Sequence, residues 1–473
     1  MKQILAVLIL FIAFHGFAQD FSCDNPSVKA AYKLAAETVD INIRRGILAA
    51  GADYGGEWTR DIAINTWNGV SLLRPQVAKR SLWSVTINKD TVGHQYWDKI
   101  IWTIAAWHHF LVTGDREFLA QAYVCSVNTM NQLEHTTFDA NYGLFMGPSV
   151  FNDGIAGYPR PIFDTLNYSS GVLDHKNSKS IKCLSTNCVY YGAYLALSKM
   201  SIALHKDKKV TADYLQKAKS LKKNIIKYLY DKDNNSLYYL IDQNGKVHKY
   251  QEALGISFAV IFGVIDGEKA TQLIRQAVVS KYGITSIYPD FSRYSREKPG
   301  RHNNLIWPMV NGFFAEASLV AGDDSSFTKE LFGLTHLALD EDKGNYDFRE
   351  IYNPNTGEPD GGWQANGSQN RDFHWASCKL QTWSATAYIS MVLHGLFGLR
   401  FNERSLSFHP YLPEGIDSIK LEGIMYRDSK LNISLKGRGH TIATFTIDGL
   451  VKSDYSIDST IKGEHNIIIY MTK

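Results

Sequence analysis

The sequence has no large excess of charge of either sign. It contains 50 Lys and Arg against 47 Asp and Glu, a formal net charge of +3 over 473 residues. The basic residues are scattered and often stand next to acidic ones, so we expect no nucleic-acid-binding surface. Cysteine is also scarce, with five residues, and no set of Cys and His has the spacing of a zinc site. No metal or organic cofactor is expected.

The few cysteines leave one pairing open. Cys183 and Cys188 are close enough in sequence to form a disulfide if the four residues between them turn back. Two buried, reduced thiols fit the sequence at least as well, because free cysteine behaves as a small apolar residue.

The apolar run at the N-terminus is too short to span a membrane comfortably. It extends from Ile4 to Phe14, follows Met1-Lys2 and precedes a small-x-small triplet at Gly16-Phe17-Ala18. This order is typical of a secretory signal peptide. We expect residues 1–18 to be removed, leaving a periplasmic or secreted protein with no stable membrane insertion. Cys23 does not follow the triplet that a lipoprotein would need.

Helical periodicity dominates the next 380 or so residues. A chain of 473 residues exceeds what one core usually organises, unless the fold is a large repetitive barrel. Apolar residues recur at helical spacing in about twelve segments. These segments are 27–46, 60–74, 76–86, 98–113, 116–134, 186–205, 210–230, 252–264, 267–281, 303–321, 325–340 and 377–397.

The helices differ in the distribution of their apolar residues. Residues 189–197 are apolar nearly all round, as in a helix of an inner ring, whereas residues 212–230 place Lys clusters opposite a Leu and Ile stripe, as in an outer helix. Alternation of this kind predicts a mainly α fold, an (α/α)6 toroid of six helical hairpins. The longest loops, 135–185, 282–302 and 341–376, should surround a central pocket.

After Leu399 the pattern changes to short strands separated by turns. Five runs have strand composition, several with alternating apolar residues, and turns such as Asp448-Gly449 separate them. We expect a small C-terminal antiparallel β module over residues 401–473, packed on a barrel formed by residues 19–400. This module contains no cluster of potentially catalytic side chains.

Two clusters near the start of predicted helices suit ligand binding. The stretch Gly55–Ile62 combines two glycines, Trp58 as a flat ring, and Arg60 with Asp61 at a helix start. Asp61 has an equally good structural explanation, because an acidic residue in a first turn complements the helix dipole. The patch that contains Trp97 and Asp98 is a weaker candidate of the same kind.

Asp153 is a candidate general acid within the longest loop. Phe151, Gly154 and Tyr158 flank it, and partial desolvation by such neighbours would raise its pKa and keep it protonated. The alternative is a simple turn, because Asn-Asp-Gly is a common turn sequence. Asp164 and Asp174 share the loop, so the choice among these carboxylates stays open.

Glu350 is a candidate for the second carboxylate. The turn sequence Asn-Pro-Asn-Thr-Gly follows it closely and should hold it on a fixed backbone, with Arg349 and Tyr352 available to orient it. Glu358 lies past the turn and should be more solvated. On the residues alone, a surface carboxylate beside a turn explains Glu350 better. The remaining candidate ligand contacts are Arg301, His302, Trp307 and Trp363. The first three open a predicted helix and could equally form a capped helix start.

At these residues the chain resembles the six-hairpin glycosidase superfamily. The stretch Trp58-Thr59-Arg60-Asp61 looks like the Trp-x-Arg-Asp segment of glucoamylases and debranching enzymes, in which Arg and Asp bind hydroxyls of the terminal sugar. Residues 350–357 are similar to the Glu-x-Tyr-Asn-Pro-x-Thr-Gly segment of oligosaccharide glucosidases, which implies that Glu350 is the general base. Asp153 occupies the place of that family's acid without reproducing its motif. Residues 381–388 also look like the last barrel helix.

The resemblance implies an exo-acting, inverting glycoside hydrolase that releases a terminal sugar from an oligosaccharide or disaccharide. Asp153 would protonate the glycosidic oxygen and Glu350 would activate water on the opposite face of the sugar. An α-linked glucoside is the first expectation, with rhamnosides and mannosides open. Three alternatives remain: a phosphorylase on the same fold, a lyase for uronic-acid polymers, and an inactive glycan-binding protein.

Overall fold

The computed structural model describes residues 20–55, 58–343 and 346–472. The predicted signal peptide, residues 1–18, lies outside the described residues. Each predicted helix is present within them, with ends that differ from the predicted ones by a few residues. Among these residues no helix combines the length and the apolar character that crossing a membrane requires.

Six of the described helices contact one another in a closed cycle: each contacts the next, and the last returns to the first. Most of their residues are buried, which agrees with the all-round apolar pattern of residues 189–197. In chain order they are α2 (Thr59–Asn65), α5 (Ile101–Thr113), α7 (Leu184–Ala203), α9 (Ala253–Ile261), α11 (Pro308–Val320) and α13 (Thr382–Ser390).

A second set of helices packs outside this cycle, each against neighbouring inner helices. Helix α8 buries only the stripe Tyr214, Ala218, Leu221, Ile225 and Leu229, which agrees with the Leu and Ile stripe in its sequence. The outer helices are α1 (Pro26–Ile41), α4 (Pro75–Ser84), α6 (Arg116–Thr137), α8 (Lys208–Leu229), α10 (Gly267–Gln276) and α12 (Asp324–Leu339).

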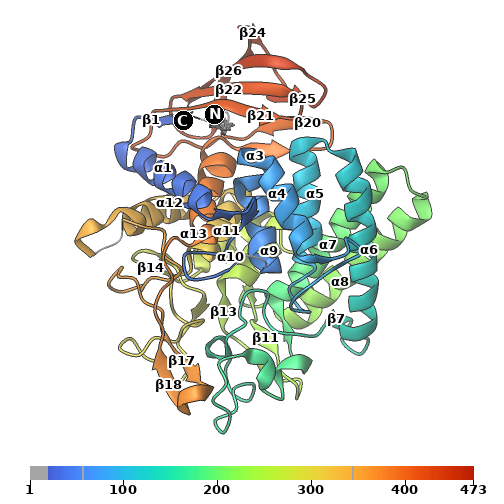
Figure 1. The fold of residues 1–473 in the computed structure, drawn as a ribbon, viewed down its shortest axis with the longest axis vertical. Coiled ribbons are helices and arrows are strands. Elements are labelled where there is room, and N and C mark those ends of the chain that lie inside the picture. The colour runs from blue at the N-terminus through green and yellow to red at the C-terminus, as the bar shows by residue number, and fades with distance from the viewer. Residues whose placement is uncertain (1–19, 56–57, 344–345, 473) are drawn as a thin grey trace, which may run out of the picture.

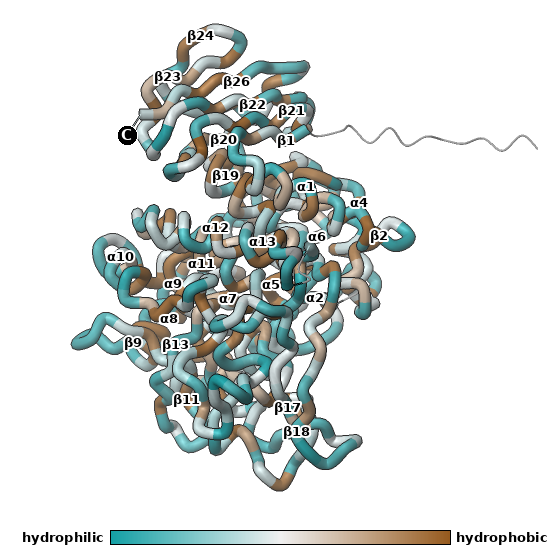
Figure 2. The backbone as a smooth tube through the Cα atoms, turned by 90° about the vertical axis from the view of Figure 1, so that its left-hand side faces the viewer, coloured by the Kyte–Doolittle hydropathy of each residue, from teal (hydrophilic) through white to brown (hydrophobic). Residues whose placement is uncertain are grey.

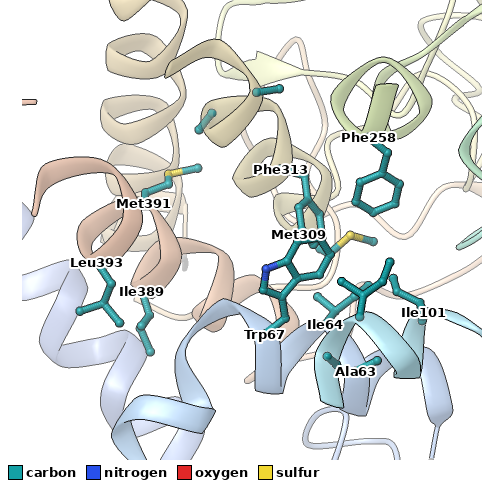
Figure 3. Close-up of a cluster of buried hydrophobic side chains, with 14 of the residues drawn as sticks. Ala63, Ile64, Trp67, Ile101, Phe258, Met309, Phe313, Ile389, Met391 and Leu393 are labelled. Atoms are coloured by element: carbon teal, nitrogen blue, oxygen red, sulfur yellow. The ribbon is translucent and has the colours of Figure 1, made fainter. Parts of the chain in front are cut away.

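The core between the inner helices is apolar and aromatic. Figure 3 shows Trp67, Phe258 and Phe313 grouped there, and the ring centroids of Trp67 and Phe313 are 5.1 Å apart. Trp67 lies in a π-helical segment, Thr66–Val70, which joins α2 to the single turn α3 (Ser71–Leu73). A second π-helical segment, Met391–Leu396, follows α13.

The two ends of the helical layer differ. A β-sheet covers one end, and long connections with short strands cover the other, as Figure 1 shows for β11, β13, β17 and β18. In Figure 2 the tube is mainly teal around β17 and β18 and browner among the central helices. Hydrophobic burial therefore holds the helices together and leaves the polar connections to shape the opposite end.

The C-terminal sheet is mixed, so the expectation of a purely antiparallel module was wrong. Its strand order is β1-β21-β22-β26-β23-β24, and β22 pairs with β26 in parallel. The bounds are β1 (Asp20–Cys23), β21 (Ser418–Tyr426), β22 (Ser429–Lys436), β23 (Thr441–Ile447), β24 (Leu450–Val451) and β26 (Gly463–Thr472). Because β1 pairs with β21, residues 401–473 do not form the sheet alone.

The other strands are short. Strands β19 (Leu399–Phe401), β20 (Ser405–Phe408) and β25 (Ser456–Asp458) form a second, three-stranded sheet in the C-terminal region. A hairpin of β17 (Trp363–Asn366) and β18 (Arg371–His374) extends from the loop end. Two-residue strands occupy 43–44, 47–48, 86–87, 91–92, 138–139, 144–145, 182–183, 230–231, 236–237, 240–241 (β11), 247–248, 251–252 (β13), 279–280, 283–284 and 287–288.

The cysteine question has a clear answer in the structure. All five cysteines, which all lie within the described residues, are free thiols. Cys183 and Cys188 are both fully buried, in strand β8 (Lys182–Cys183) and helix α7. The interpretation as buried thiols is therefore confirmed.

Candidate active site

A cavity of about 120 Å³ lies where the long connections meet the first residues of α2 and α13. Eight predicted site residues line it: Trp58, Arg60, Asp61, Asp153, Arg301, His302, Trp307 and Glu350. The other lining residues are Ala50, Tyr54, Phe151, Gln364, Gln381 and Trp383. Segments far apart in sequence thus supply aromatic rings, two guanidinium groups and three carboxyl groups to one small volume.

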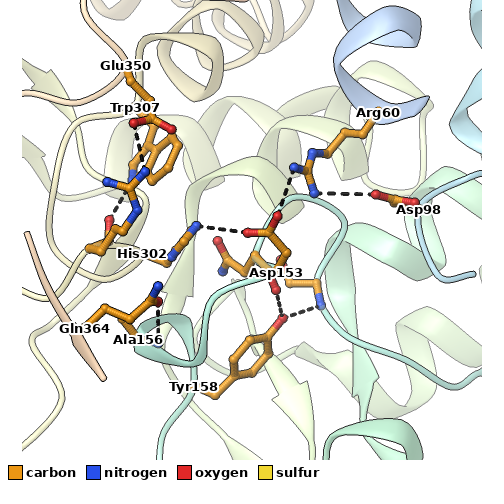
Figure 4. Close-up of polar contacts among 12 residues, drawn as sticks. Arg60, Asp98, Asp153, Ala156, Tyr158, His302, Trp307, Glu350 and Gln364 are labelled. Carbon is orange, nitrogen blue, oxygen red and sulfur yellow. Dashed lines mark hydrogen bonds and ion pairs between the residues drawn. The ribbon is translucent and has the colours of Figure 1, made fainter. Parts of the chain in front are cut away.

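Arg60 links three carboxyl groups on one side of this cavity. Its Nη2 lies 3.4 Å from Oδ2 of Asp153 and 3.8 Å from Oδ2 of Asp61, and its Nη1 lies 3.4 Å from Oδ2 of Asp98. Its guanidinium carbon also lies 5.5 Å from the ring centre of Trp383. Figure 4 shows Arg60 with Asp98 and Asp153. One positive charge therefore holds three potentially negative groups in place.

The three carboxyl groups differ in protonation. Burial raises the pKa of Asp61 and of Asp98 to about 7, because Arg60 offsets only part of the desolvation and the neighbouring carboxylates oppose ionisation. Burial acts on Asp153 too, but Arg60 and His302 outweigh it and hold the pKa of Asp153 well below its usual range. Asp153 is thus the ionised member of the group.

This result corrects the expectation for Asp153. Its apolar neighbours were expected to raise its pKa, whereas charged partners from other segments lower it. Nε2 of His302 lies 3.4 Å from Oδ1 of Asp153, and the carboxyl side chain is 29% exposed. The sequence around Asp153 shows only the apolar neighbours, since Arg60 and His302 reach it through the tertiary fold.

A network of hydrogen bonds fixes the loop that carries Asp153. The Tyr158 hydroxyl accepts from the backbone N–H of Ser149 (2.9 Å) and donates to the carbonyl of Asn152 (2.6 Å). The Asn152 amide in turn donates to the hydroxyl of Tyr239 (3.1 Å). These buried contacts hold Asp153 at the cavity wall.

The rival carboxylates of the same loop lie elsewhere. Asp164 and Asp174 are exposed and do not line the cavity. Asp174 accepts a hydrogen bond from Ser169, and Asp164 accepts one from the backbone of Leu166. Both therefore organise the loop, and Asp153 is the carboxylate that the loop presents to the cavity.

Glu350 occupies a separate part of the cavity wall with its own cation. Arg301 donates from Nη2 to Oε2 of Glu350 at 2.8 Å, and the Tyr54 hydroxyl donates to Oε1 at 3.3 Å. The backbone N–H of Cys378 lies 3.4 Å from Oε2. Glu350 is only 4% exposed. Three donors thus orient one buried carboxylate.

The turn after Glu350 is formed as predicted, although the residues expected to orient Glu350 contact other groups. The side-chain oxygen of Asn353 accepts from the backbone of Asn355 and Thr356, and Gly357 has a φ of 76°. Arg349 and Tyr352 instead contact Asp347: the Arg349 guanidinium is 3.1 Å from its carboxylate and the Tyr352 hydroxyl donates to its carbonyl.

Glu358, the predicted rival of Glu350, is exposed and does not line the cavity. Its expected solvation is therefore confirmed.

Comparison with known families identifies the chain. Residues 66–376 match the mannosylglycerate hydrolase MGH1-like glycoside hydrolase domain. The chain belongs to this family. It is a glycoside hydrolase, with neighbours of the six-hairpin glycosidase class. Residues 399–449 match the C-terminal domain of glycosyl hydrolase family 65. No curated protein matches the chain.

Solved structures show the same fold at low identity. The GH63 mannosylglycerate hydrolase from Thermus thermophilus is 15% identical over 76% of this chain and 100% of its own, with a TM-score of 0.59. A GH78 rhamnosidase of Bacillus sp. GL1 is 12% identical over 96% of this chain and 44% of its own, with a TM-score of 0.62. A sialidase is 17% identical over 89% of this chain and 39% of its own, with a TM-score of 0.65. The chain thus spans less than half the length of the rhamnosidase and of the sialidase.

Three predicted ligand contacts do not line the cavity of this glycoside hydrolase. Trp97 is 1% exposed and its indole donates to the carbonyl of Ser149, so it supports the Asp153 loop from behind. Asp98 is fully buried behind Arg60. Trp363 lies in β17 next to the cavity residue Gln364, and alternate residues of a strand point to opposite sides.

Several cavity residues escaped the sequence analysis. Tyr54 lies between the partners Arg301 and Glu350, yet it stands in a loop segment with no motif of its own. Gln364 lines the cavity while its carboxamide oxygen accepts from the backbone of Ala156 at 3.3 Å. A signal for Tyr54 was available, because it lies only four residues before Trp58 in a Gly-rich stretch.

Proposed function

We propose that the protein is an exo-acting, inverting glycosidase that releases a terminal uncharged sugar from an oligosaccharide or disaccharide. The first candidate for this sugar is α-linked glucose. One observation carries this proposal: of the three carboxyl groups that line the cavity, Asp153 and Glu350 are bound by different arginines, Asp153 by Arg60 and Glu350 by Arg301. Inversion requires two carboxyl groups on opposite faces of the sugar, with room for a water molecule beside one of them.

The proposed fold is the (α/α)6 toroid. The closed cycle of inner helices and the outer helices packed on it support six helical hairpins around one axis. In this arrangement the cavity lies at the loop end of the ring, and the mixed sheet closes the opposite end. A small cavity at one end of a closed ring suits the binding of a chain end, which supports exo action.

In the proposed mechanism Glu350 removes a proton from water as the water attacks the anomeric carbon. Asp153 delivers a proton to the glycosidic oxygen as the bond to the leaving sugar breaks. Arg301 and Tyr54 keep the Glu350 carboxylate aimed at the water. Trp58 offers an aromatic face to the C–H side of the ring, and Asp61 accepts from its hydroxyls.

The charges in the cavity favour an uncharged sugar. Arg60 and Arg301 both line the cavity and both are bound by carboxylates. The four internal residues that the structure does not describe, Gly56, Glu57, Gly344 and Asn345, add no basic side chain to this count. A ligand such as the mannosylglycerate of the Thermus thermophilus relative carries a carboxylate, which needs an uncommitted cation. Neutral mannosides and rhamnosides remain candidate substrates beside glucosides.

The first experiment is a screen of α-linked disaccharides, aryl glycosides and mannosylglycerate, each with and without inorganic phosphate. We expect release of a free monosaccharide from a neutral substrate at a rate that phosphate does not change. A sugar 1-phosphate would identify a phosphorylase, and an unsaturated product absorbing in the ultraviolet would identify a lyase. Binding without turnover would leave a glycan-binding protein.

We also propose that the chain is exported through the signal peptide predicted at residues 1–18. The support is the sequence pattern alone: a charged start, an apolar run and a small-x-small site before Gln19. Expression of the full chain in a Gram-negative host, followed by cell fractionation and N-terminal sequencing, tests this. A mature protein that begins at Gln19 in the periplasmic fraction is expected, and a cytoplasmic protein that retains Met1 or Lys2 contradicts it.

A further inference from the structure

Two adjacent residues contact the two proposed catalytic carboxylates. Arg301 donates to Glu350 at 2.8 Å, and Nε2 of His302 lies 3.4 Å from Asp153. In Figure 4 His302 lies between Glu350 and Asp153. Asp153 and Glu350 come from different loops, and the dipeptide 301–302 joins their contact partners through a single peptide group.

The backbone of this dipeptide is fixed on both sides. The N–H of Arg301 donates to the carbonyl of Trp363 at 3.0 Å, and the indole of Trp307 donates to the carbonyl of Arg301 at 2.8 Å. The N–H of Asn303 donates to the carbonyl of Gly300 at 2.9 Å. Hydrogen bonds therefore hold the peptide group between the two side chains in one orientation.

Both side chains are also fixed. The Arg301 guanidinium donates to the carbonyl of Gly361 at 3.0 Å as well as to Glu350. The His302 ring stacks on Trp307, with centroids 4.8 Å apart and planes inclined by 22°. Arg301 and His302 are 6% and 3% exposed. Each side chain thus has one available arrangement in the free site.

We propose that Arg301 and His302 act together as positioning residues that set the spacing and the paired protonation of the two carboxylates. This inference rests on the proposed function. The Cα atoms of neighbouring residues are about 3.8 Å apart, so a fixed dipeptide transmits any shift of one carboxylate partner to the other. An inverting enzyme needs its carboxyl groups about 6.5–9.5 Å apart, which a rigid connection between them can maintain.

His302 can serve Asp153 in both protonation states. Burial lowers the pKa of His302, and Asp153 offsets part of this effect, so the ring is neutral and donates from Nε2 to the ionised carboxylate. The ring nitrogen Nδ1 is buried and has no hydrogen-bond partner among the described residues. When Asp153 holds a proton, the ring can carry its own proton on Nδ1 and accept at Nε2. Arg60, which only donates, cannot do this.

The test measures kcat, KM and the pH profile of single and double variants on an unactivated disaccharide that the wild type hydrolyses. We expect Arg301→Met and His302→Leu each to lower kcat about 100-fold with KM within about threefold. The double variant should be no more than about threefold worse than the poorer single one, because residues that act as a unit are not additive.

The pH profile separates positioning from simple structural support. Without the ring N–H beside Asp153, the alkaline limb of His302→Leu should move to higher pH, because a donated hydrogen bond favours the ionised carboxylate. His302→Gln should recover part of kcat, because an amide can donate or accept. Arg301→Lys should recover little, because an ammonium lacks the planar fork.

Arg74→Met and His440→Leu are matched controls outside the cavity, and both should keep the wild-type kcat. The inference would be overturned if the losses of kcat in the two single variants multiply in the double variant. It would also be overturned if kcat falls while the pH profile is unchanged and thermal stability is reduced. Singles that keep kcat within about threefold would overturn it as well, while leaving the proposed function intact. Absence of any wild-type turnover would overturn both.

Discussion

Asp153, the proposed general acid, lines the cavity but does not hold the proton that this role requires. In the free site Arg60 and His302 hold it ionised, so it must gain a proton as substrate binds. A sugar hydroxyl that accepts from Arg60 weakens the hold of Arg60 on Asp153, and exclusion of water then favours the protonated form. Asp61, whose pKa burial raises to about 7, is the rival in the same cavity, because a carboxyl group with that pKa holds a proton more readily than Asp153 does.

Substitution of the acid distinguishes these two residues. Asp153→Asn should lower kcat on a disaccharide about 10²- to 10⁴-fold, the usual contribution of general acid catalysis. On a glycosyl fluoride the loss should be under about tenfold, because fluoride departs without a proton. Steady-state kinetics on both substrates measures this.

The matched control is Asp164→Asn, in the same loop but exposed, which should act like the wild type on both substrates. If Asp61→Asn shows the substrate-dependent loss and Asp153→Asn does not, the acid is Asp61.

Prediction from sequence at the level of single residues succeeded where chemistry was local. Glu350 precedes a turn that the sequence Asn-Pro-Asn-Thr-Gly predicts, and the structure contains that turn. Tyr54 and Gln364 reach the cavity through packing between distant segments, which no local pattern encodes. Trp97 illustrates the opposite error: an indole within a polar patch suggested a ligand face, but the fold buries the ring and uses its N–H internally.

At the level of elements, the helices were predictable because burial of one stripe or of all faces leaves a period in the sequence. The positions of the loops in the sequence were predictable, but their backbone conformations were not. The Asp153 loop takes its shape partly from a buried partner, Tyr239, which belongs to a different segment. The mixed sheet was mispredicted because strand composition does not reveal which strands pair or in which direction.

Gly154 tests how closely the elements around the cavity meet. A Cβ on Gly154 would lie 2.2 Å from the carboxamide oxygen of Gln364 and 2.4 Å from Nδ1 of His302. Gly154→Ala should therefore displace both side chains and lower kcat at least about tenfold, since small misplacements at a reacting centre are costly. Kinetics together with thermal unfolding measures this.

Gly367→Ala, at the tip of the β17–β18 hairpin, is the matched control, because its Cβ would meet no atom closer than 3.6 Å. It should keep wild-type kcat. Equal activity of the two variants would show that the contact between the Asp153 loop, β17 and His302 tolerates movement.

At the level of the whole molecule, the N-terminal strand ties the helical layer to the C-terminal sheet. Phe21 in β1 is 6% exposed. The centroid of its ring lies 4.4 Å from the ring centroid of Tyr32 in α1 and 6.2 Å from that of Phe397. Phe21→Ala should cost about 3 kcal/mol of unfolding free energy, the usual penalty for removing a buried ring. Urea unfolding followed by circular dichroism measures it.

Ser22→Ala changes the next residue of β1, which is only partly buried, and should cost under about 0.5 kcal/mol. A small effect of Phe21→Ala would mean that β1 contributes little to joining the two parts.

Stability should also fall at acid pH because of a buried histidine far from the cavity. Burial lowers the pKa of His109 to about 4, against about 6.5 in an unfolded chain. The unfolded state therefore binds a proton first as pH falls below about 6.5, and this part of the stability is lost between about pH 6.5 and 4. His109→Gln should lose about 2 kcal/mol less than the wild type between about pH 6.5 and 4.5.

Urea titrations at the two pH values measure this difference, with the exposed His440→Gln as control. Parallel losses in all three proteins would assign the acid sensitivity to other groups.

The central claim concerns two carboxylates acting on opposite faces of a sugar, and the configuration of the first product tests it most directly. Proton NMR, recorded within the first turnovers on an α-linked disaccharide, distinguishes the two anomers before they interconvert. The account predicts that the β anomer of the released sugar appears first. Appearance of the α anomer first would show retention and contradict the assignment of Glu350 as a base that activates water.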